Sequence, residues 1–206
     1  VLRQSENLHR YDDALKKLGK LGLIYPCFCT RSDITREIAK APIAPHAPKK
    51  NLYPGTCRHL PDSEREERID QGENHALRLD IDKAQSLVGK NLKFEDKTHG
   101  VIISRPGQFG DIVLARKDVA TSYHLSATID DAFQGVTLVT RGEDLLSATS
   151  IHRLLQELLG LPVPHYQHHK LIIDETGERL AKRKGAESLQ SMRHAGKTHK
   201  DVLTAL

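Results

Sequence analysis

The first part of the chain carries a clear helical pattern of apolar positions. These positions follow one another at steps of three and four residues: Leu8, Tyr11, Leu15, Leu18 and Leu21. Residues at this spacing share one face of an α-helix. Because Ser5 suits a helix start and Gly22 a helix end, we predict one amphipathic helix between them.

The helical pattern is lost from Cys27 to about Gly72. Prolines stand at positions 26, 42, 45, 48, 54 and 61, separated by charged residues. A segment of this composition buries little apolar surface, so we expect it to build only a small core of its own.

Further along, the apolar positions change to a strand-like pattern. In the stretch "HALRLDI", residues 75–81, polar and apolar side chains alternate, which predicts a strand. Residues 100–118, "GVIISRPGQFGDIVLARKD", place two apolar runs on either side of Pro106 and Gly107. A Pro-Gly pair between apolar runs favours a turn, so we predict a β-hairpin here.

Beyond residue 119 the pattern is typical of an α/β unit. A short apolar run, Val136–Thr140, predicts a buried strand, and we expect a helix from about Ser147 to Leu159. The apolar stripe of this helix consists of Ile151, Leu154, Leu155 and Leu158, and its end is marked by Gly160 and Pro162. A short strand within "HHKLII" and a brief helical tail follow.

Composition narrows the class of protein. The chain has 206 residues, of which 38% are hydrophobic and 28% charged, with a net charge of +4. No apolar run approaches the ~18 residues needed to cross a bilayer. Its beginning lacks the basic and then apolar segments of a signal peptide. We therefore expect a soluble, cytoplasmic globular protein, and its slightly basic charge permits a nucleic-acid partner without requiring one.

The three cysteines of the chain are candidates for a metal site. Cys27 and Cys29 are one residue apart, and Cys57 follows a glycine-containing turn. Three cysteines cannot all pair in disulfides, and neighbours at this spacing bridge each other poorly. Together they supply three ligands for a tetrahedral zinc ion, which would stabilise a segment with little core. The alternative is a set of scattered buried thiols.

The fourth zinc ligand is left open by the spacing alone. Tyr53 precedes Cys57 by four residues, His59 follows it by two, and His46 is more distant. Chemistry favours His59, because imidazole binds zinc far more often than phenolate does. The twelve histidines form no His-Glu-x-x-His pattern, so we expect most of them at the surface.

Two further groups of residues are candidates for ligand binding. The stretch "RLAKRKG", residues 179–185, is a basic loop that can hold a polyphosphate, although such runs are more often solvated surface. Arg141 directly follows the predicted strand, at the carboxyl end where open α/β sheets bind ligands. Its guanidinium suits a carboxylate, and Tyr123 can add a hydroxyl. The alternative is an ion pair of Arg141 with Glu143 or Asp144.

Several stretches together resemble the glutamyl-queuosine tRNA(Asp) synthetases, which are shortened relatives of class I glutamyl-tRNA synthetases. The stretches are "LGLIYPCFCTRSDI", "YPGTCR", residues 110–162 and "HHKLIIDETGERLAKRKGA". The long block at 110–162 is similar to glutamyl-type synthetases in general. "YPGTCR" paired with Cys-x-Cys resembles the queuosine-modifying branch in particular.

This resemblance implies a fold and an activity. The fold is an α/β, Rossmann-like class I catalytic domain in residues 1–26 and 112–206, interrupted by a zinc-bearing insertion at 27–111. The implied activity is that of a ligase, which activates glutamate with ATP and Mg²⁺ and transfers it to the queuosine base of tRNA(Asp). The expected partners are glutamate, ATP and tRNA(Asp), with one zinc ion, no membrane and a monomeric state.

The resemblance also assigns residues to the zinc site. The zinc ligands of the queuosine-modifying branch match Cys27, Cys29, Tyr53 and Cys57. On this basis Tyr53 replaces His59 as the expected fourth ligand.

The same resemblance assigns residues to the active site. Tyr123 and Arg141 match residues that recognise glutamate. "RLAKR" matches the flexible ATP-binding signature, with Lys182 as its catalytic, nucleotide-contacting lysine. Ala181 is a departure, because a serine is common at that position.

One unit of the family is expected to be missing. Class I synthetases open with a strand, a His-Ile-Gly-His-type signature and a helix that seat ATP, and the match begins beyond that unit. We therefore expect the chain to be N-terminally incomplete and not to form the adenylate by itself. The alternative functions are a fragment of an ordinary glutamyl-tRNA synthetase, or a non-catalytic zinc-containing RNA-binding module.

Overall fold

The computed structural model describes residues 2–40, 52–89, 91–116, 118, 120–173 and 188–204. Its helices are α1 (Leu8–Lys20), α2 (Arg31–Lys40), α3 (Asp62–Asp70), α4 (Ile81–Val88), α5 (Tyr123–Phe133), α6 (Thr149–Leu159), α7 (Leu189–His194) and α8 (His199–Thr204). Its strands are β1 (Ile24–Cys27), β2 (Ala76–Leu79), β3 (Lys93–Asp96), β4 (Gly100–Ile103), β5 (Val113–Arg116), β6 (Leu138–Gly142) and β7 (His165–His169). Short 3-10 turns include η1 (Gln4–Glu6), η2 (Thr56–His59), η3 (Pro106–Phe109) and η4 (Glu143–Leu145).

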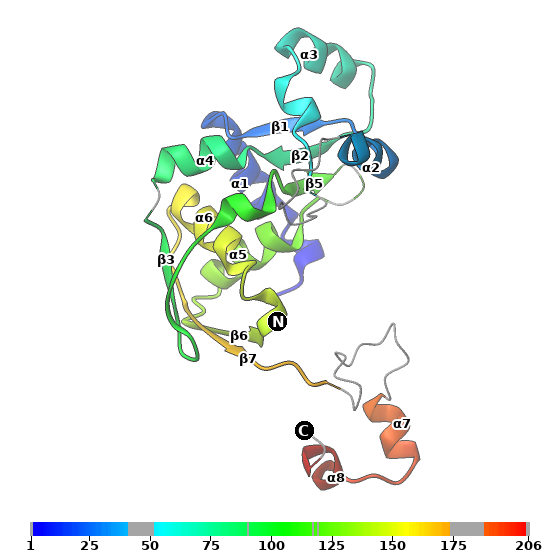
Figure 1. The fold of residues 1–206 in the computed structure, drawn as a ribbon, viewed down its shortest axis with the longest axis vertical. Helices are drawn as coiled ribbons and strands as arrows, with labels where there is room; N and C mark the ends of the chain where they lie inside the picture. The colour runs from blue at the N-terminus through cyan, green and yellow to red at the C-terminus, as the bar shows by residue number, and fades with distance from the viewer. Residues whose placement is uncertain are drawn as a thin grey trace.

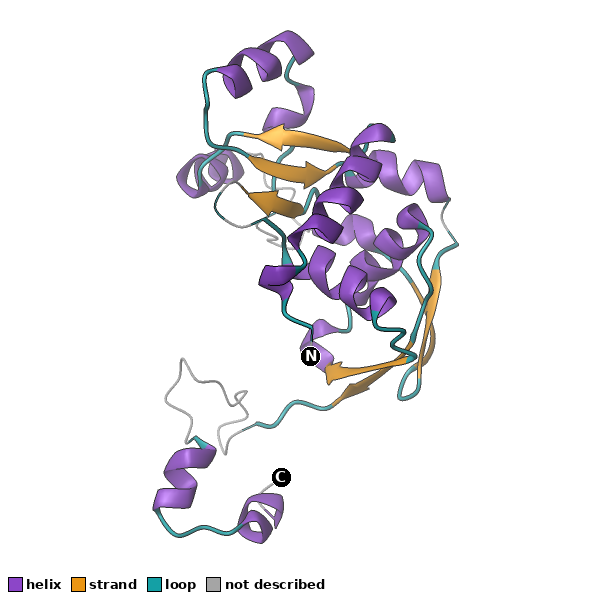
Figure 2. Ribbon diagram, turned by 180° about the vertical axis from the view of Figure 1, so that it is seen from behind, coloured by secondary structure: helices purple, strands orange, loops and turns teal. Residues whose placement is uncertain are grey.

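The described strands form two sheets. One sheet has the order β1-β2-β5 and is antiparallel throughout. The other has the order β4-β3-β7-β6, in which β3 pairs antiparallel with β4 and β7 pairs parallel with both β3 and β6. The helices α1, α4, α5 and α6 lie between the two sheets (Figure 1). Figure 2 shows the same arrangement from behind.

The main hydrophobic core forms where these helices meet. Its buried side chains come from α1, α4, α5 and α6 and from the β1-β2-β5 sheet. The predicted stripe of α6 faces this core, and Ile151, Leu154 and Leu155 are fully buried. Each such side chain stabilises the fold by roughly 1.5–3 kcal/mol relative to exposure. A smaller second cluster contains Tyr25, Cys27, Phe28 and Cys57.

The two predicted amphipathic helices are present, with one correction. Gly22 ends the first helix as expected, because its φ of 65° is a left-handed conformation that glycine adopts without strain. Ser5, however, does not cap that helix. It lies within η1, and α1 begins after Asn7, because the chain first makes a separate 3-10 turn.

The predicted hairpin around Pro106 and Gly107 is wrong. The two apolar runs do form strands, but β4 pairs with β3, and β5 pairs with β2 in the other sheet. The Pro-Gly pair lies in η3, which carries the chain from one sheet to the other. The strand predicted at Val136–Thr140 forms two residues later, as β6.

The strand pairing also bears on the expected division of the chain at residue 111. Asp96 of β3, inside the expected insertion, pairs with Tyr166 of β7 in the expected catalytic part. The hydrogen-bonded sheet therefore continues across that boundary, and the division itself stays a prediction. In the part of the chain that the structure describes, no helix is long and apolar enough to span a bilayer.

Candidate active site

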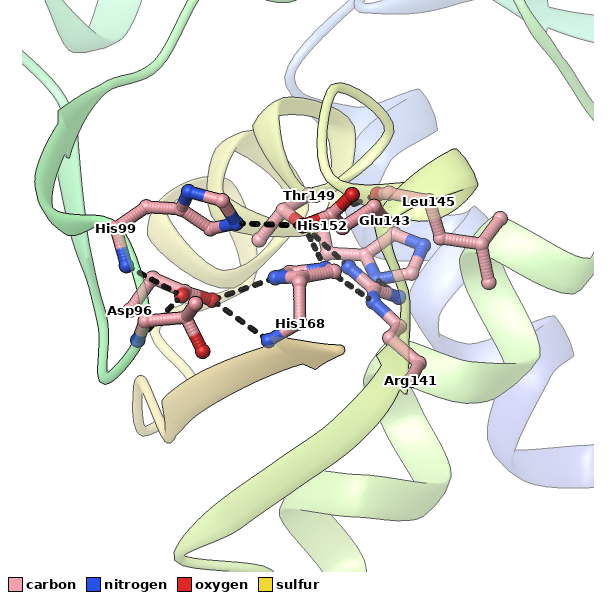
Figure 3. Close-up of polar contacts among 9 residues, drawn as sticks. Asp96, His99, Arg141, Glu143, Leu145, Thr149, His152 and His168 are labelled. Carbon is pink, nitrogen blue, oxygen red and sulfur yellow. Dashed lines mark hydrogen bonds and ion pairs between the residues drawn. The ribbon is translucent and has the colours of Figure 1, made fainter. Parts of the chain in front are cut away.

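Arg141 forms the centre of a polar group at the carboxyl end of β6 (Figure 3). Its Nε donates a hydrogen bond to Nε2 of His168 at 3.0 Å. One terminal nitrogen donates to Nδ1 of His152 at 3.1 Å and to the Tyr123 hydroxyl at 3.3 Å. The other donates to the hydroxyl of Thr149. We call these five residues the arginine site.

The fold brings the arginine site together from separate elements. The parallel register of β6 and β7 places Arg141 directly beside His168. Thr149 and His152 lie in the first turn of α6, and Tyr123 is the first residue of α5. Strands that run in parallel end at the same edge of a sheet, which is where open α/β sheets bind ligands.

The histidines around Arg141 are neutral. An arginine N–H only donates, so the ring nitrogens that face it must be acceptors. The proton of His168 is then on Nδ1, which lies 2.5 Å from Oδ2 of Asp96. The proton of His152 is on Nε2, which lies 3.2 Å from Nδ1 of His124.

The electrostatics agree with these neutral rings. Burial lowers the pKa of His152 to about 2, with the charges of Arg141 and the neighbouring imidazoles acting in the same direction. Burial also lowers the pKa of His124 and of His168, although the hydrogen bond to Asp96 opposes it in His168. Near pH 7 the rings therefore act as hydrogen-bond acceptors without adding charge.

The hydrogen-bond partners of Arg141 are therefore all neutral groups. Among the described residues, no ion pair of Arg141 with Glu143 is found. Oε1 of Glu143 lies 3.6 Å from Nε2 of His99 instead. Burial raises the pKa of Asp131, and the charge of Arg141 acts in the opposite direction. A site of this kind attracts a carboxylate ligand.

Sequence reasoning paired Arg141 with Tyr123 but missed the buried histidines. His152 is 2% exposed and His168 is fully buried, although we expected most of the histidines at the surface. A signal was present in "HYQHH" of β7, where Tyr166 and His168 share the buried face of an alternating strand. The partner of His168, Asp96, lies 72 residues away, and no local pattern indicates that contact.

The second polar group is formed by Cys27, Cys29 and Cys57, which we call the cysteine cluster. Their sulfur atoms all lie within 4.8 Å of one another, and Sγ of Cys29 and Cys57 are 3.4 Å apart. Tetrahedral zinc with Zn–S bonds of 2.3 Å holds its sulfurs about 3.8 Å apart, so these three thiols fit such an ion. The end of β1 supplies Cys27 and η2 supplies Cys57.

The pKa shifts of the thiols in the cysteine cluster favour metal binding. The hydrogen bond from Cys27 lowers the pKa of Cys57, whereas the same bond, with burial, raises the pKa of Cys27. A thiolate is therefore favoured at Cys57, and thiolate is the form that binds metal. The buried guanidinium of Arg78 lies 3.8 Å above the ring of Tyr53, which adds positive charge nearby.

The surroundings of the cysteine cluster separate the candidates for a fourth ligand. The hydroxyl of Tyr53 lies 3.7 Å from Sγ of Cys29 and accepts a hydrogen bond from the Cys57 backbone N–H at 2.7 Å. The side chain of His59 is exposed and does not join the described metal-binding group. His46 lies outside the described residues. Tyr53 as a ligand stays a prediction.

An open cavity of about 620 Å³ connects the two groups. It reaches from Cys29 to Tyr123, so it touches both the cysteine cluster and the arginine site. Three arginines contribute to its walls: Arg31, Arg78 and Arg116. Apolar side chains, among them Ile34 and Val113, form other parts of the walls. Lys182, the expected ATP-binding lysine, lies outside the described residues.

Comparison with known proteins gives consistent matches. Residues 1–206 match the family model of the catalytic domain of class I tRNA synthetases (E and Q). A glutamyl-Q tRNA(Asp) synthetase from Rhodobacter capsulatus is 47% identical over 211 residues, which cover 98% of this chain and 73% of that protein. A protein of the same name from Nocardia farcinica is 43% identical over 206 residues, covering 100% and 62%.

A solved structure also resembles the chain. The crystal structure of a glutamate tRNA ligase from Elizabethkingia meningosepticum, in complex with its amino acid, superposes with a TM-score of 0.69 at 25% identity. The match covers 89% of this chain and 36% of the ligase. The chain thus spans about a third of that ligase and less than two thirds of the Nocardia relative.

Proposed function

The chain belongs to the class I tRNA synthetases of the E and Q type, and we propose that the protein carrying it activates glutamate with ATP and transfers it to the queuosine base of tRNA(Asp). The observation that carries this proposal is the arginine site. It presents a guanidinium that has no carboxylate partner among the described residues, beside a tyrosine hydroxyl. That combination is suited to a ligand with a carboxylate.

The chemistry of activation indicates which of the two carboxylates of glutamate Arg141 binds. Activation begins when the α-carboxylate of glutamate attacks the α-phosphorus of ATP, and pyrophosphate leaves. A guanidinium bound to the attacking oxygen would reduce its nucleophilicity. We therefore assign Arg141 and Tyr123 to the side-chain carboxylate, which does not react, so that they select and orient the substrate.

No side chain is required as nucleophile or base in this step. Catalysis consists of positioning the two substrates and stabilising negative charge on the phosphates. We assign the second task to Lys182, from its place in the "RLAKR" stretch, and to the Mg²⁺ that accompanies ATP. Zinc, bound by Cys27, Cys29, Cys57 and Tyr53, would supply structural support to a segment with little core.

The acceptor is supported by two features of the chain. Relatives at 47% and 43% identity carry the name glutamyl-Q tRNA(Asp) synthetase. The cavity between the cysteine cluster and Tyr123 has Arg31 and Arg78 in its walls, and arginines can bind the phosphodiester backbone of a tRNA segment. The arginine site argues against a non-catalytic RNA-binding module. Such a module would not require a guanidinium that is held in one orientation by neutral, buried hydrogen-bond acceptors.

The test is transfer of radiolabelled glutamate by the intact protein. We expect ATP-dependent labelling of tRNA(Asp) that contains queuosine, and none of tRNA(Asp) with guanosine at that position. Labelling should persist after the 3′-terminal adenosine is removed. Labelling that requires the 3′ end and prefers tRNA(Glu) would support the ordinary glutamyl-tRNA synthetase instead.

A further inference from the structure

Behind Arg141 lies a buried acid–histidine pair that the proposed reaction does not itself use. The carboxylate of Asp96 and the ring of His168 are both fully buried, and Oδ2 of Asp96 lies 2.5 Å from Nδ1 of His168 (Figure 3). The same oxygen accepts the backbone N–H of His168 at 3.1 Å. The other oxygen accepts the backbone N–H groups of Thr98 and His99.

Asp96 therefore controls which nitrogen of His168 carries the proton. A carboxylate can only accept, so Nδ1 of His168 must donate to it. Nε2 is then left with a lone pair, and that lone pair receives the Nε–H of Arg141 at 3.0 Å. With the proton on Nε2, two N–H donors would face each other at this distance.

We propose that Asp96 and His168 are positioning residues for Arg141, which fix the imidazole tautomer and thereby hold the guanidinium in the orientation that binds the substrate carboxylate. The inference rests on the proposed function, because it assigns Arg141 to glutamate. Asp96 is supplied by β3, so a strand of the expected insertion contributes to the expected catalytic part.

A neighbouring pair provides a matched control. Glu95 and His165 also link β3 to β7, with Oε2 and Nδ1 3.1 Å apart. Their side chains are 66% and 60% exposed, on the opposite faces of the same two strands. If acid–histidine pairs here only join the strands, the two pairs should behave alike. If Asp96 acts through Arg141, only the buried pair should affect glutamate.

The first measurement needs no substrate. Nitrogen-detected NMR of ¹⁵N-labelled imidazoles identifies the protonated nitrogen of His168 in the intact protein. We expect protonated Nδ1 and unprotonated Nε2. Protonated Nε2 in the unmodified protein would overturn the inference, whatever the protein's activity.

The second measurement is steady-state ATP–pyrophosphate exchange by the Asp96→Asn variant. With its NH₂ in the place of Oδ2, the asparagine donates to Nδ1, so that the proton moves to Nε2 and faces the N–H of Arg141. The same change removes the acceptor of the His168 backbone N–H. We expect KM for glutamate to rise about tenfold or more, because a buried hydrogen bond is replaced by two N–H donors that face each other. KM for ATP should change by less than about twofold. Glu95→Gln should leave both constants within about twofold.

The third measurement separates tautomer control from structural support. In His168→Gln, the amide oxygen accepts the hydrogen bond from Arg141. An amide oxygen is always an acceptor, so this contact does not depend on Asp96, and we expect only about a threefold rise in KM for glutamate. Adding Asp96→Asn to this variant should then raise KM for glutamate clearly less than it does in the unmodified protein, because only the loss of an acceptor for backbone N–H groups remains. An equally large effect of Asp96→Asn with either residue at position 168 would show that Asp96 only stabilises the fold.

The outcomes also distinguish the inference from the proposed function. If the unmodified protein shows no glutamate-dependent exchange, the proposed function fails, and the tautomer measurement still decides whether Asp96 orients His168. If exchange is normal and Asp96→Asn changes KM for ATP as much as KM for glutamate, the inference fails and the proposed function stands.

Discussion

The arginine site and the cysteine cluster differ in how far their polar groups are already paired. Each nitrogen of the Arg141 guanidinium has a neutral acceptor, supplied by residues that are themselves held by hydrogen bonds. In the cysteine cluster the sulfurs mainly face one another, and Cys29 and Cys57 approach to 3.4 Å. The first group is thus preorganised for a ligand, whereas the second presents three converging sulfurs that suit a metal ion.

This difference separates the expected roles of the two groups. The arginine site is held by hydrogen bonds within the protein and offers one positive charge to a substrate. The cysteine cluster lies in the small second core, where a bound ion contributes to folding itself. Changes in the arginine site should therefore alter the use of glutamate without altering metal content, and changes in the cysteine cluster should alter metal content and stability first.

Removal of a cysteine should have the greatest effect. The intact, reduced protein should contain one equivalent of zinc, and Cys57→Ala should lose it, because structural zinc contributes on the order of 10 kcal/mol to the folding of small domains. Elemental analysis measures the metal, and limited proteolysis of the cysteine-containing segment measures its folding. Less than about half an equivalent in the unmodified protein, prepared without chelator, would contradict a zinc site.

Arg141→Ala should lower kcat/KM for glutamate by about 30- to 1000-fold, because a charge-assisted contact of ~2–4 kcal/mol is lost. KM for ATP should change little, and the metal content should not change. ATP–pyrophosphate exchange measures both constants. Arg3→Ala is a suitable control, because Arg3 is an exposed arginine that forms an ion pair with Glu6. Equal losses for both substrates would indicate that Arg141 has a structural role.

Tyr53→Phe should weaken zinc binding by about 10- to 100-fold, the mildest loss among the expected ligands. His59→Ala should leave the affinity unchanged, since His59 is exposed and lies outside the cysteine cluster. Competition with a chromophoric chelator gives both affinities. If His59→Ala releases the metal and Tyr53→Phe does not, the assignment of the fourth ligand is wrong.

The neutral histidines should make the arginine site sensitive to acid. His152 has a pKa of about 2 in the fold, whereas an unfolded histidine has a pKa of about 6.5. Below pH 6.5 the unfolded state binds a proton that the folded state excludes, so stability falls as the pH falls, by up to ~1.4 kcal/mol per pH unit.

Urea unfolding at pH 7 and pH 5 measures this slope. His152→Gln should reduce it, whereas His169→Gln should not, since His169 is exposed. A slope that is unchanged in His152→Gln would mean that the imidazole is protonated in the folded protein.

The parts of the fold that could be predicted from the sequence are those set by local pattern. The helices α1 and α6 were expected because their apolar residues recur at helical spacing, and their glycine ends are local features. The partners of β4 and β5 could not be predicted, because a Pro-Gly pair favours a turn in many contexts. Pairing with β3 and β2 depends on packing between distant segments.

The same distinction applies to the two candidate sites. The cysteines could be grouped because their spacing and chemistry are diagnostic, and Arg141 could be placed by its position after a strand. Asp96 and His168 could not, since each is an ordinary residue until the parallel pairing of β3 with β7 brings them together. Burial then decides which of the many histidines are functional candidates.

The central claim is that Arg141 presents an unneutralised positive charge to a carboxylate substrate. Glutamine tests it most directly, because its side chain has the shape of glutamate but carries a neutral amide. In ATP–pyrophosphate exchange by the intact protein, glutamate should be used at least about 100-fold more efficiently than glutamine, as kcat/KM. Equal use of the two amino acids would contradict the claim.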